Sequence, residues 1–223
     1  MFGWLNKIHN FVFQSALFME NKNYQEDLQH IRKMMEKSSR FISLSGISGI
    51  FAGLFALAGA LYVYFIFEKN GVDYFDGTRN FYDINIIQHL VLVAMVIMIL
   101  AVSSGAYFTI KKSKAHHLKI WDATTKKLLF NFSVPLATGG LFCASLLYYQ
   151  LHGFLAPTTL IFYGLALFNA GNYTYSDIKY LGLCEIVLGI VSLFFLGYGL
   201  LFWAIGFGVL HIVYGIIMHR KYR

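Results

Sequence analysis

Two residues that could take part in proton or metal chemistry, Glu185 and His211, lie in a stretch of the chain that is nearly all apolar, residues 180–222. A carboxylate and an imidazole are side chains that exchange protons and bind cations. Inside a lipid bilayer an ionised side chain costs about 2.5–3.5 kcal/mol or more. Both residues are therefore expected to face the interior of a helix bundle.

The spacing of Glu185 and His211 predicts that they lie at the same depth. A turn near Tyr198 divides the segment into two spans, and each residue is thirteen positions from that turn. In an antiparallel hairpin both would lie about 20 Å from the turn, at about 1.5 Å per helical residue. His211 is therefore the expected partner of Glu185.

Three interpretations of this intramembrane polar pair remain open. The two residues could hold their spans in register, relay protons or bind a cation for transport, or belong to a metal site. Zinc needs three or four ligands in one cluster, and haem needs facing axial ligands. The other histidines near the spans and in the loops are expected at depths other than that of this pair: His89, His116, His117 and His152. No metal, cofactor or catalytic residue is therefore predicted.

Further polar side chains lie where the fourth span ends. Asn169, Asn172 and Tyr175 come shortly before Glu185 enters the fifth span. They could line a polar pocket together with the pair. The alternative, which we favour, is that they cap the helix and hydrogen-bond the turn.

The composition places most of this chain in lipid. Of its 223 residues, 57% are hydrophobic and only 13% are charged, whereas about a quarter are charged in a typical soluble domain. The apolar residues form long blocks, which is typical of transmembrane helices. Phosphate-binding loops, nucleophile elbows and zinc-protease motifs are absent from the sequence.

The blocks predict an all-α, polytopic transmembrane bundle of six helices in three hairpins. The expected spans are roughly 41–66, 85–109, 128–149, 154–171, 180–197 and 199–218, so the transmembrane domain covers 41–218. A basic tail, 219–223, follows the last span.

The basic residues predict the orientation of the bundle. Sixteen of the 18 Lys and Arg residues fall before the first span, in the loops 110–127 and 172–179, or at the C-terminus. Positively charged loops stay in the cytoplasm, so both termini are expected there. We expect these loops to attract anionic lipid head groups. No nucleic-acid-binding module accompanies the charge, so nucleic acid is not an expected partner.

The first 40 residues are expected to form a cytoplasmic N-terminal region. Residues 1–18 could be a helix lying in the membrane interface or an upstream extension without function. Residues 22–40 have apolar side chains at helical spacing, which predicts an amphipathic helix.

Small residues recur at every fourth position of the first span, at Ser45, Gly49 and Gly53. This pattern lets two helix backbones approach closely in lipid. It could serve packing within the bundle, or it could form the interface of a homo-oligomer.

Three stretches carry a resemblance to known proteins: "LQHIRKMMEKSSRFISLSGISGIFAG", "FYGLALFNAGNYTYSDIKYLGLCEIVLG" and "GLLFWAIGFGVLHIVYGIIMHRKY". From about residue 27 to its end, the chain resembles a family of six-span bacterial membrane proteins of unknown function, best represented in Bacteroidetes. The resemblance implies the inner membrane of a bacterium. It implies no activity.

The expected function is that of a non-enzymatic membrane protein that senses, scaffolds or regulates, with Glu185 and His211 serving the structure. The alternative is a small transporter, a proton- or cation-coupled carrier that uses this pair.

Overall fold

The computed structural model describes residues 46–71, 84–115 and 120–222. The predictions for residues 1–40, and for Ser45, lie outside the described residues. The described secondary structure is helical throughout, which confirms the all-α bundle. Its helices are α2 (Gly46–Lys69), α3 (Ile84–Ala115), α4 (Ala123–Tyr148), α5 (Leu155–Ala170), α6 (Asp177–Phe194), α7 (Gly199–Trp203) and α8 (His211–Lys221), and a π-helical segment, Ala204–Leu210, joins the last two.

Five helical stretches of the described residues are long and apolar enough to cross a membrane: 46–69, 84–115, 123–148, 152–170 and 196–221. The remaining helix, α6, has 18 residues and includes Asp177, Lys179 and Glu185. At about 1.5 Å per residue it is about 27 Å long, close to the roughly 30 Å of a hydrocarbon core. The chain is an integral membrane protein.

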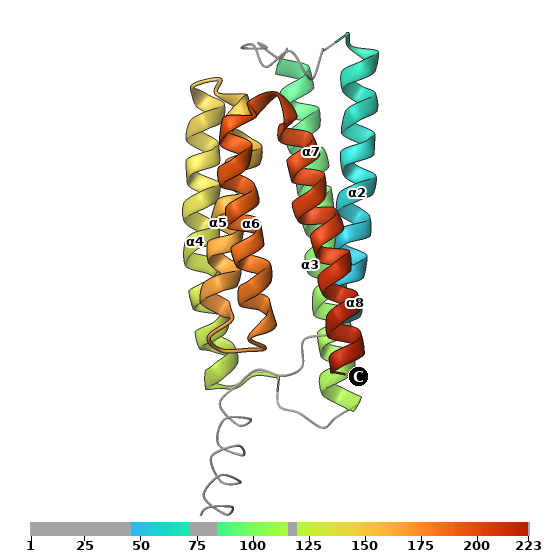
Figure 1. Ribbon diagram of the computed structural model, residues 1–223, viewed down its shortest axis with the longest axis vertical. Coiled ribbons are helices and arrows are strands. Elements are labelled where there is room, and N and C mark those ends of the chain that lie inside the picture. Colours follow the sequence, from blue (N-terminus) through green and yellow to red (C-terminus); the bar gives the residue numbers. More distant parts are fainter. Residues whose placement is uncertain (1–45, 72–83, 116–119, 223) are drawn as a thin grey trace, which may run out of the picture. The chain divides into compact units, whose positions relative to one another are not determined.

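The helices form two groups of three (Figure 1). In the first group, α2 packs on α3 and on the C-terminal helix made of α7, the π segment and α8. In the second group, α5 packs between α4 and α6. Successive helices run up and down, so α3, α5 and α8 end, and α2, α4 and α6 begin, at one end of the bundle (Figure 1). We call it the C-terminal end.

Glycines bring the helices of each group into close contact. A Cβ atom on Gly164 of α5 would lie 2.6 Å from the carbonyl oxygen of Gly182 in α6. In the first group, a Cβ atom on Gly53 of α2 would lie 2.6 Å from the carbonyl oxygen of Gly208. Gly49 faces the Gly215 backbone in the same way, at 3.3 Å. The described small residues of the first span therefore pack within the chain.

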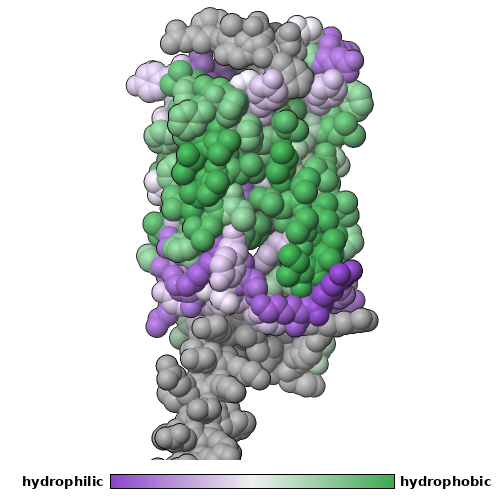
Figure 2. Space-filling view, in the orientation of Figure 1, coloured by the Kyte–Doolittle hydropathy of each residue, from purple (hydrophilic) through white to green (hydrophobic). Residues whose placement is uncertain are grey.

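The surface of the bundle matches a bilayer (Figure 2). Apolar side chains cover the middle of both groups, and hydrophilic residues lie at the two ends. Helices α3 and α4 contribute much of this exposed apolar surface, including Leu92, Met98, Phe130 and Leu141. Lipid acyl chains are the natural partner of such faces.

The loop before α4 is fixed by a helix cap outside the spans. The Asp122 carboxylate accepts a hydrogen bond of 2.7 Å from the Thr125 backbone N–H. This bond holds the pKa of the Asp122 carboxyl below its ordinary value. The cap fixes where α4 begins at the C-terminal end of the bundle.

The close contact of α5 and α6 gives a stability prediction. Gly164→Ala should destabilise the protein by about 1–3 kcal/mol, because the new methyl group would meet the backbone of α6. Thermal unfolding of the purified protein in detergent measures the effect. Gly140→Ala on α4 is the matched control, because a Cβ atom there meets nothing within 4 Å. Equal stability of the two variants would contradict the close packing.

Candidate functional site

Glu185 and His211 meet at the boundary between the two groups. Glu185 Oε1 lies 3.4 Å from His211 Nδ1, and the side chains are 0% and 8% exposed. Glu185 is in the middle of α6, in the second group, and His211 is the first residue of α8, in the first group. Their contact thus joins the groups midway along the bundle.

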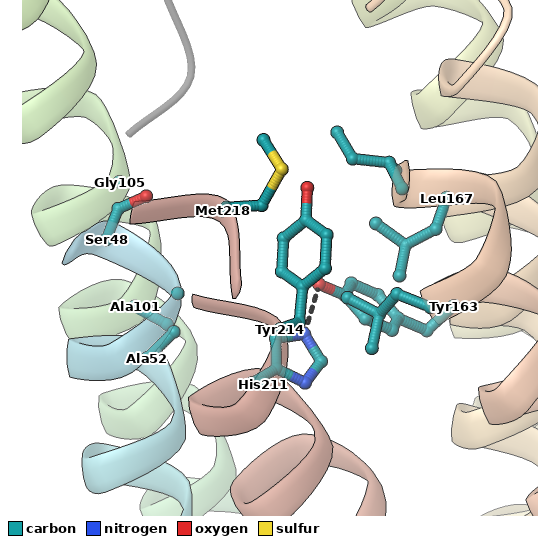
Figure 3. A pocket seen from close by; sticks show the side chains of 12 residues that line it. Ser48, Ala52, Ala101, Gly105, Tyr163, Leu167, His211, Tyr214 and Met218 are labelled. Atoms are coloured by element: carbon teal, nitrogen blue, oxygen red, sulfur yellow. Dashed lines mark hydrogen bonds between the residues drawn. The ribbon is translucent and has the colours of Figure 1, made fainter. Parts of the chain in front are cut away.

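The hydrogen bonds of His211 fix the position of its ring and its tautomer. Its Nδ1 lies 3.0 Å from the Gly206 carbonyl oxygen. A carbonyl can only accept, so Nδ1 carries the hydrogen. In the neutral ring Nε2 is then an acceptor, and the Tyr163 hydroxyl donates to it over 2.9 Å (Figure 3).

The π segment before His211 makes room for this arrangement. Gly206 lies within it, and its carbonyl oxygen is the one that accepts from His211. A Cβ atom on Gly206 would lie 2.5 Å from Glu185 Oε2 and would also overlap the Leu160 side chain. A glycine is therefore required beside the carboxylate. Single π turns within α-helices are frequent at functional sites.

The Glu185 carboxyl group is incompletely satisfied. Neither of its oxygens has a hydrogen-bond partner among the described residues. A buried carboxylate in a purely structural pair usually accepts several hydrogen bonds, because leaving it unpaired costs free energy. The contact with His211 therefore does not satisfy the group by itself.

A cavity of about 140 Å³ lies beside His211, between the two groups. Small residues of α2 and α3 form one wall, and Leu167 of α5 and Leu181 of α6 form the opposite wall. Figure 2 shows the surface hollowed between the two apolar faces. Glu185 is not among the lining residues, and it contacts His211, which is.

Two tyrosines bring hydroxyl groups to the cavity. Tyr163 lines it from α5 and Tyr214 from α8, where the Tyr214 ring extends between Met218 and Leu167 (Figure 3). The Tyr214 hydroxyl is buried and has no hydrogen-bond partner among the described residues. The Tyr163 ring also packs on Phe207, with ring centroids 5.0 Å apart, which helps to hold its hydroxyl at His211.

A second polar contact between the groups lies at the C-terminal end of the bundle. Lys221 Nζ donates to the Asp177 carboxylate at 2.8 Å, and the Tyr222 hydroxyl donates to it at 2.7 Å. Lys112 Nζ donates to the Tyr222 carbonyl oxygen at 3.3 Å, and the rings of Tyr175 and Tyr222 lie 4.0 Å apart. We call these five residues the clasp.

The clasp lies next to the cavity. Ile178 and Met218 line the cavity, and they are close in sequence to Asp177 and Lys221 of the clasp. The cavity therefore extends from His211 toward the clasp, which joins α6 to the end of α8.

The polar residues at the end of the fourth span do not line the cavity. The Asn172 side chain donates to the Asn169 carbonyl oxygen at 3.2 Å, in the turn after α5. Tyr175 belongs to the clasp. The tyrosines that bring hydroxyls to the cavity, Tyr163 and Tyr214, were not singled out from the sequence. The sequence did hold a signal for Tyr214, because this residue lies one helical turn after His211.

No group of three or more His, Cys, Asp and Glu residues that could hold a metal ion is found in the described part of the chain. Among these residues the Glu185–His211 contact is extended by the Tyr163 hydroxyl and not by a third metal ligand. The site can therefore bind protons and form hydrogen bonds.

The clasp gives a prediction about access to the cavity. In a Cys143→Ser/Cys184→Ser background, Met218→Cys places a thiol in the cavity wall near the clasp. Asp177→Asn should raise the rate at which a charged maleimide labels this thiol severalfold, because it removes the carboxylate to which Lys221 and Tyr222 donate. Asp122→Asn, outside the clasp, is the control and should leave the rate unchanged. An unchanged rate in Asp177→Asn would show that the clasp does not limit access.

In comparisons with known proteins, no protein-family model, no curated protein and no solved structure matches the chain. The resemblance of residues 27–223 to a bacterial membrane protein family stays a prediction. The chain is an integral membrane protein whose two helix groups meet at a buried carboxylate–histidine contact beside a cavity.

Proposed function

We propose that this protein is a proton-coupled carrier of a small solute. In this proposal the cavity between the two groups holds the solute, and the Glu185–His211 pair holds the proton. The observation that carries the proposal is the buried carboxyl group of Glu185. It touches His211 across the boundary, and its oxygens lack hydrogen-bond partners among the described residues.

An unsatisfied carboxyl group in a membrane is unfavourable for stability and useful for proton binding. Ionisable residues within spans are rare, and they mark ion pathways and proton relays. Protonation of Glu185 would remove its charge and the associated desolvation cost. The free energy of the contact between the groups would then depend on whether the proton is bound.

The arrangement of the helices supports a movement of one group against the other. Glycines pack the helices tightly within each group, at Gly53 in the first and Gly164 in the second. Between the groups, the cavity is bounded by the His211 contacts and the clasp. Carriers commonly expose a central site to each side in turn by rocking one bundle of helices against another.

In this proposal the clasp faces the cytoplasm of a bacterium, and the protein lies in the inner membrane. The excess of Lys and Arg before the first span, in the loops 110–127 and 172–179 and at the C-terminus supports this orientation. The same residues would attract anionic lipid head groups. The resemblance of residues 27–223 to a bacterial family supports the compartment.

A second candidate is the sensing, scaffolding or regulatory role in which Glu185 and His211 serve the structure. The observation that favours it is the fixed position of the His211 ring, which is held by the Gly206 carbonyl on one side and the Tyr163 hydroxyl on the other. In this case the pair would fix the packing of the two groups.

Thermal stability separates the two candidates. For a carrier, Glu185→Gln should leave the unfolding midpoint unchanged or raise it between about pH 5 and 8, because it removes an unsatisfied carboxyl group. His211→Ala should lower stability by about 1–3 kcal/mol, because Tyr163 loses its acceptor. The structural candidate instead predicts that each single variant is destabilised and that the double variant is little worse than either, since the two residues are coupled.

The carrier itself is tested by a distance measurement. Spin labels at Tyr180→Cys on α6 and Ile217→Cys on α8, both exposed positions, report the separation of the groups in a Cys143→Ser/Cys184→Ser background. The distance distribution should shift between about pH 5.5 and 8, where a histidine can titrate.

Glu185→Gln should abolish this shift, because it removes the negative charge that the proton on the pair neutralises. A distribution that is independent of pH in the parent protein, or that shifts equally in Glu185→Gln, would overturn the proposed coupling. Asp122→Asn, a carboxylate outside the boundary between the groups, is the matched control and should keep the shift.

A further inference from the structure

The two tyrosine hydroxyl groups at the cavity can present acceptors to a ligand. With His211 neutral, the Tyr163 O–H is committed to Nε2, so the Tyr163 oxygen offers only its lone pairs to the cavity. The Tyr214 hydroxyl has no partner among the described residues and is free to accept a hydrogen bond. No Lys or Arg is among the described residues that line the cavity. The two tyrosine oxygens can therefore accept from the N–H groups of a ligand, and the lack of a cationic side chain among the described lining residues disfavours an anion.

The size and walls of the cavity limit the ligand. Its volume is about 140 Å³, close to that of an engineered cavity that holds benzene, a molecule of about six heavy atoms. The two tyrosine rings in its wall can attract a cation through their π-electrons. The small residues opposite them, Ala52, Ala101 and Gly105, leave space for a short alkyl chain.

The buried charge at the boundary requires one compensating cation. When Glu185 is ionised and His211 is neutral, the pair carries one net negative charge in apolar surroundings, with no hydrogen-bond donor on the carboxylate among the described residues. An uncompensated buried charge is strongly unfavourable. One proton on the pair, or one cation in the adjacent cavity, would neutralise it.

From these observations we propose that the cavity binds a small protonated amine in exchange for the proton on the Glu185–His211 pair. The ammonium N–H groups donate to the oxygens of Tyr163 and Tyr214, and its charge compensates Glu185. This inference rests on the proposed carrier and names the class of its solute.

The hydrogen bond between Tyr163 and His211 couples the binding of the proton to the binding of the ammonium ion. When a proton from water binds His211 Nε2, the new N–H donates to the Tyr163 oxygen, and the Tyr163 hydroxyl hydrogen turns away from the ring. The cavity then presents a donor where it presented an acceptor, and an imidazolium lines its wall. The ammonium ion loses one hydrogen bond and meets a like charge, so it leaves.

The groups that face His211 allow this exchange. Glu185 faces it from α6, Tyr163 from α5, and Tyr214 lies one turn along its own helix. The residues of α2 and α3 that line the cavity beside it, such as Gly49 and Ala101, do not titrate. Proton binding at His211 or Glu185 is thus the event that opposes the ammonium ion.

The test measures binding of propylammonium to the full-length protein in lipid nanodiscs, by calorimetry at pH 8. Propanol and propionate are the matched neutral and anionic ligands. Propylammonium should bind, propanol should bind more weakly, and propionate should not bind. Below the pH at which the pair takes up its proton, the affinity for propylammonium should fall about tenfold per pH unit, because one proton competes with one ammonium ion.

Variants identify the groups involved. Tyr214→Phe keeps the ring but removes the acceptor, and it should weaken propylammonium binding by about tenfold. Glu185→Gln should abolish both the binding and its pH dependence. Tyr107→Phe is the control, because Tyr107 lies exposed on α3 outside the cavity lining, and it should bind as the parent protein does.

Failure of the two proposals can be distinguished. If propylammonium does not bind, or if propionate binds equally well, the amine proposal is overturned. Binding that survives Glu185→Gln unchanged would overturn it as well. The pH-driven change in spin-label distance, measured separately, would then still support a proton-coupled carrier of another solute. Absence of both effects would overturn the carrier together with its solute.

Discussion

The contact between Glu185 and His211 joins two groups of helices midway between the ends of the bundle. Every other feature of the site is arranged around it. Gly206 leaves room for the carboxylate and supplies the carbonyl that orients the imidazole. Tyr163 occupies the remaining ring nitrogen. The oxygens of the Glu185 carboxyl group have no hydrogen-bond partner among the described residues. In the proposed carrier, the protonation of this group sets how the two groups pack.

The lipid surroundings explain which contacts hold the helices of each group together. Apolar burial adds little to helix association within a bilayer, so close backbone contact and hydrogen bonds must hold the helices together. Glycines provide that contact within each group, as at Gly164 and Gly215. Between the groups, close contacts at Gly206 and Phe207 lie beside polar contacts and a cavity. In the proposed carrier, a change at a polar contact moves one group against the other while the glycine contacts within each group are kept.

Much of this architecture could be predicted from the sequence, because hydropathy and turn position act locally. The apolar blocks predicted the helical bundle, and the equal spacing around Tyr198 placed Glu185 and His211 at one depth. The tyrosines of the cavity could not be predicted in the same way, since tyrosines in spans resemble those at membrane interfaces. The clasp joins Lys112, Asp177 and Lys221 across three helices, and such contacts depend on packing between distant parts of the chain.

Because of the π-helical segment Ala204–Leu210, the site depends on the number of residues in this stretch as well as on their types. Such a segment accommodates an additional residue in a helix, so the residues after it are turned by about 100° about the helix axis relative to an uninterrupted α-helix. A related chain lacking one residue of this stretch could keep a histidine at the start of α8 and yet present it to a different neighbour. Among relatives, the number of residues between Trp203 and His211 would therefore distinguish chains that can form this site from chains that merely contain its amino acids.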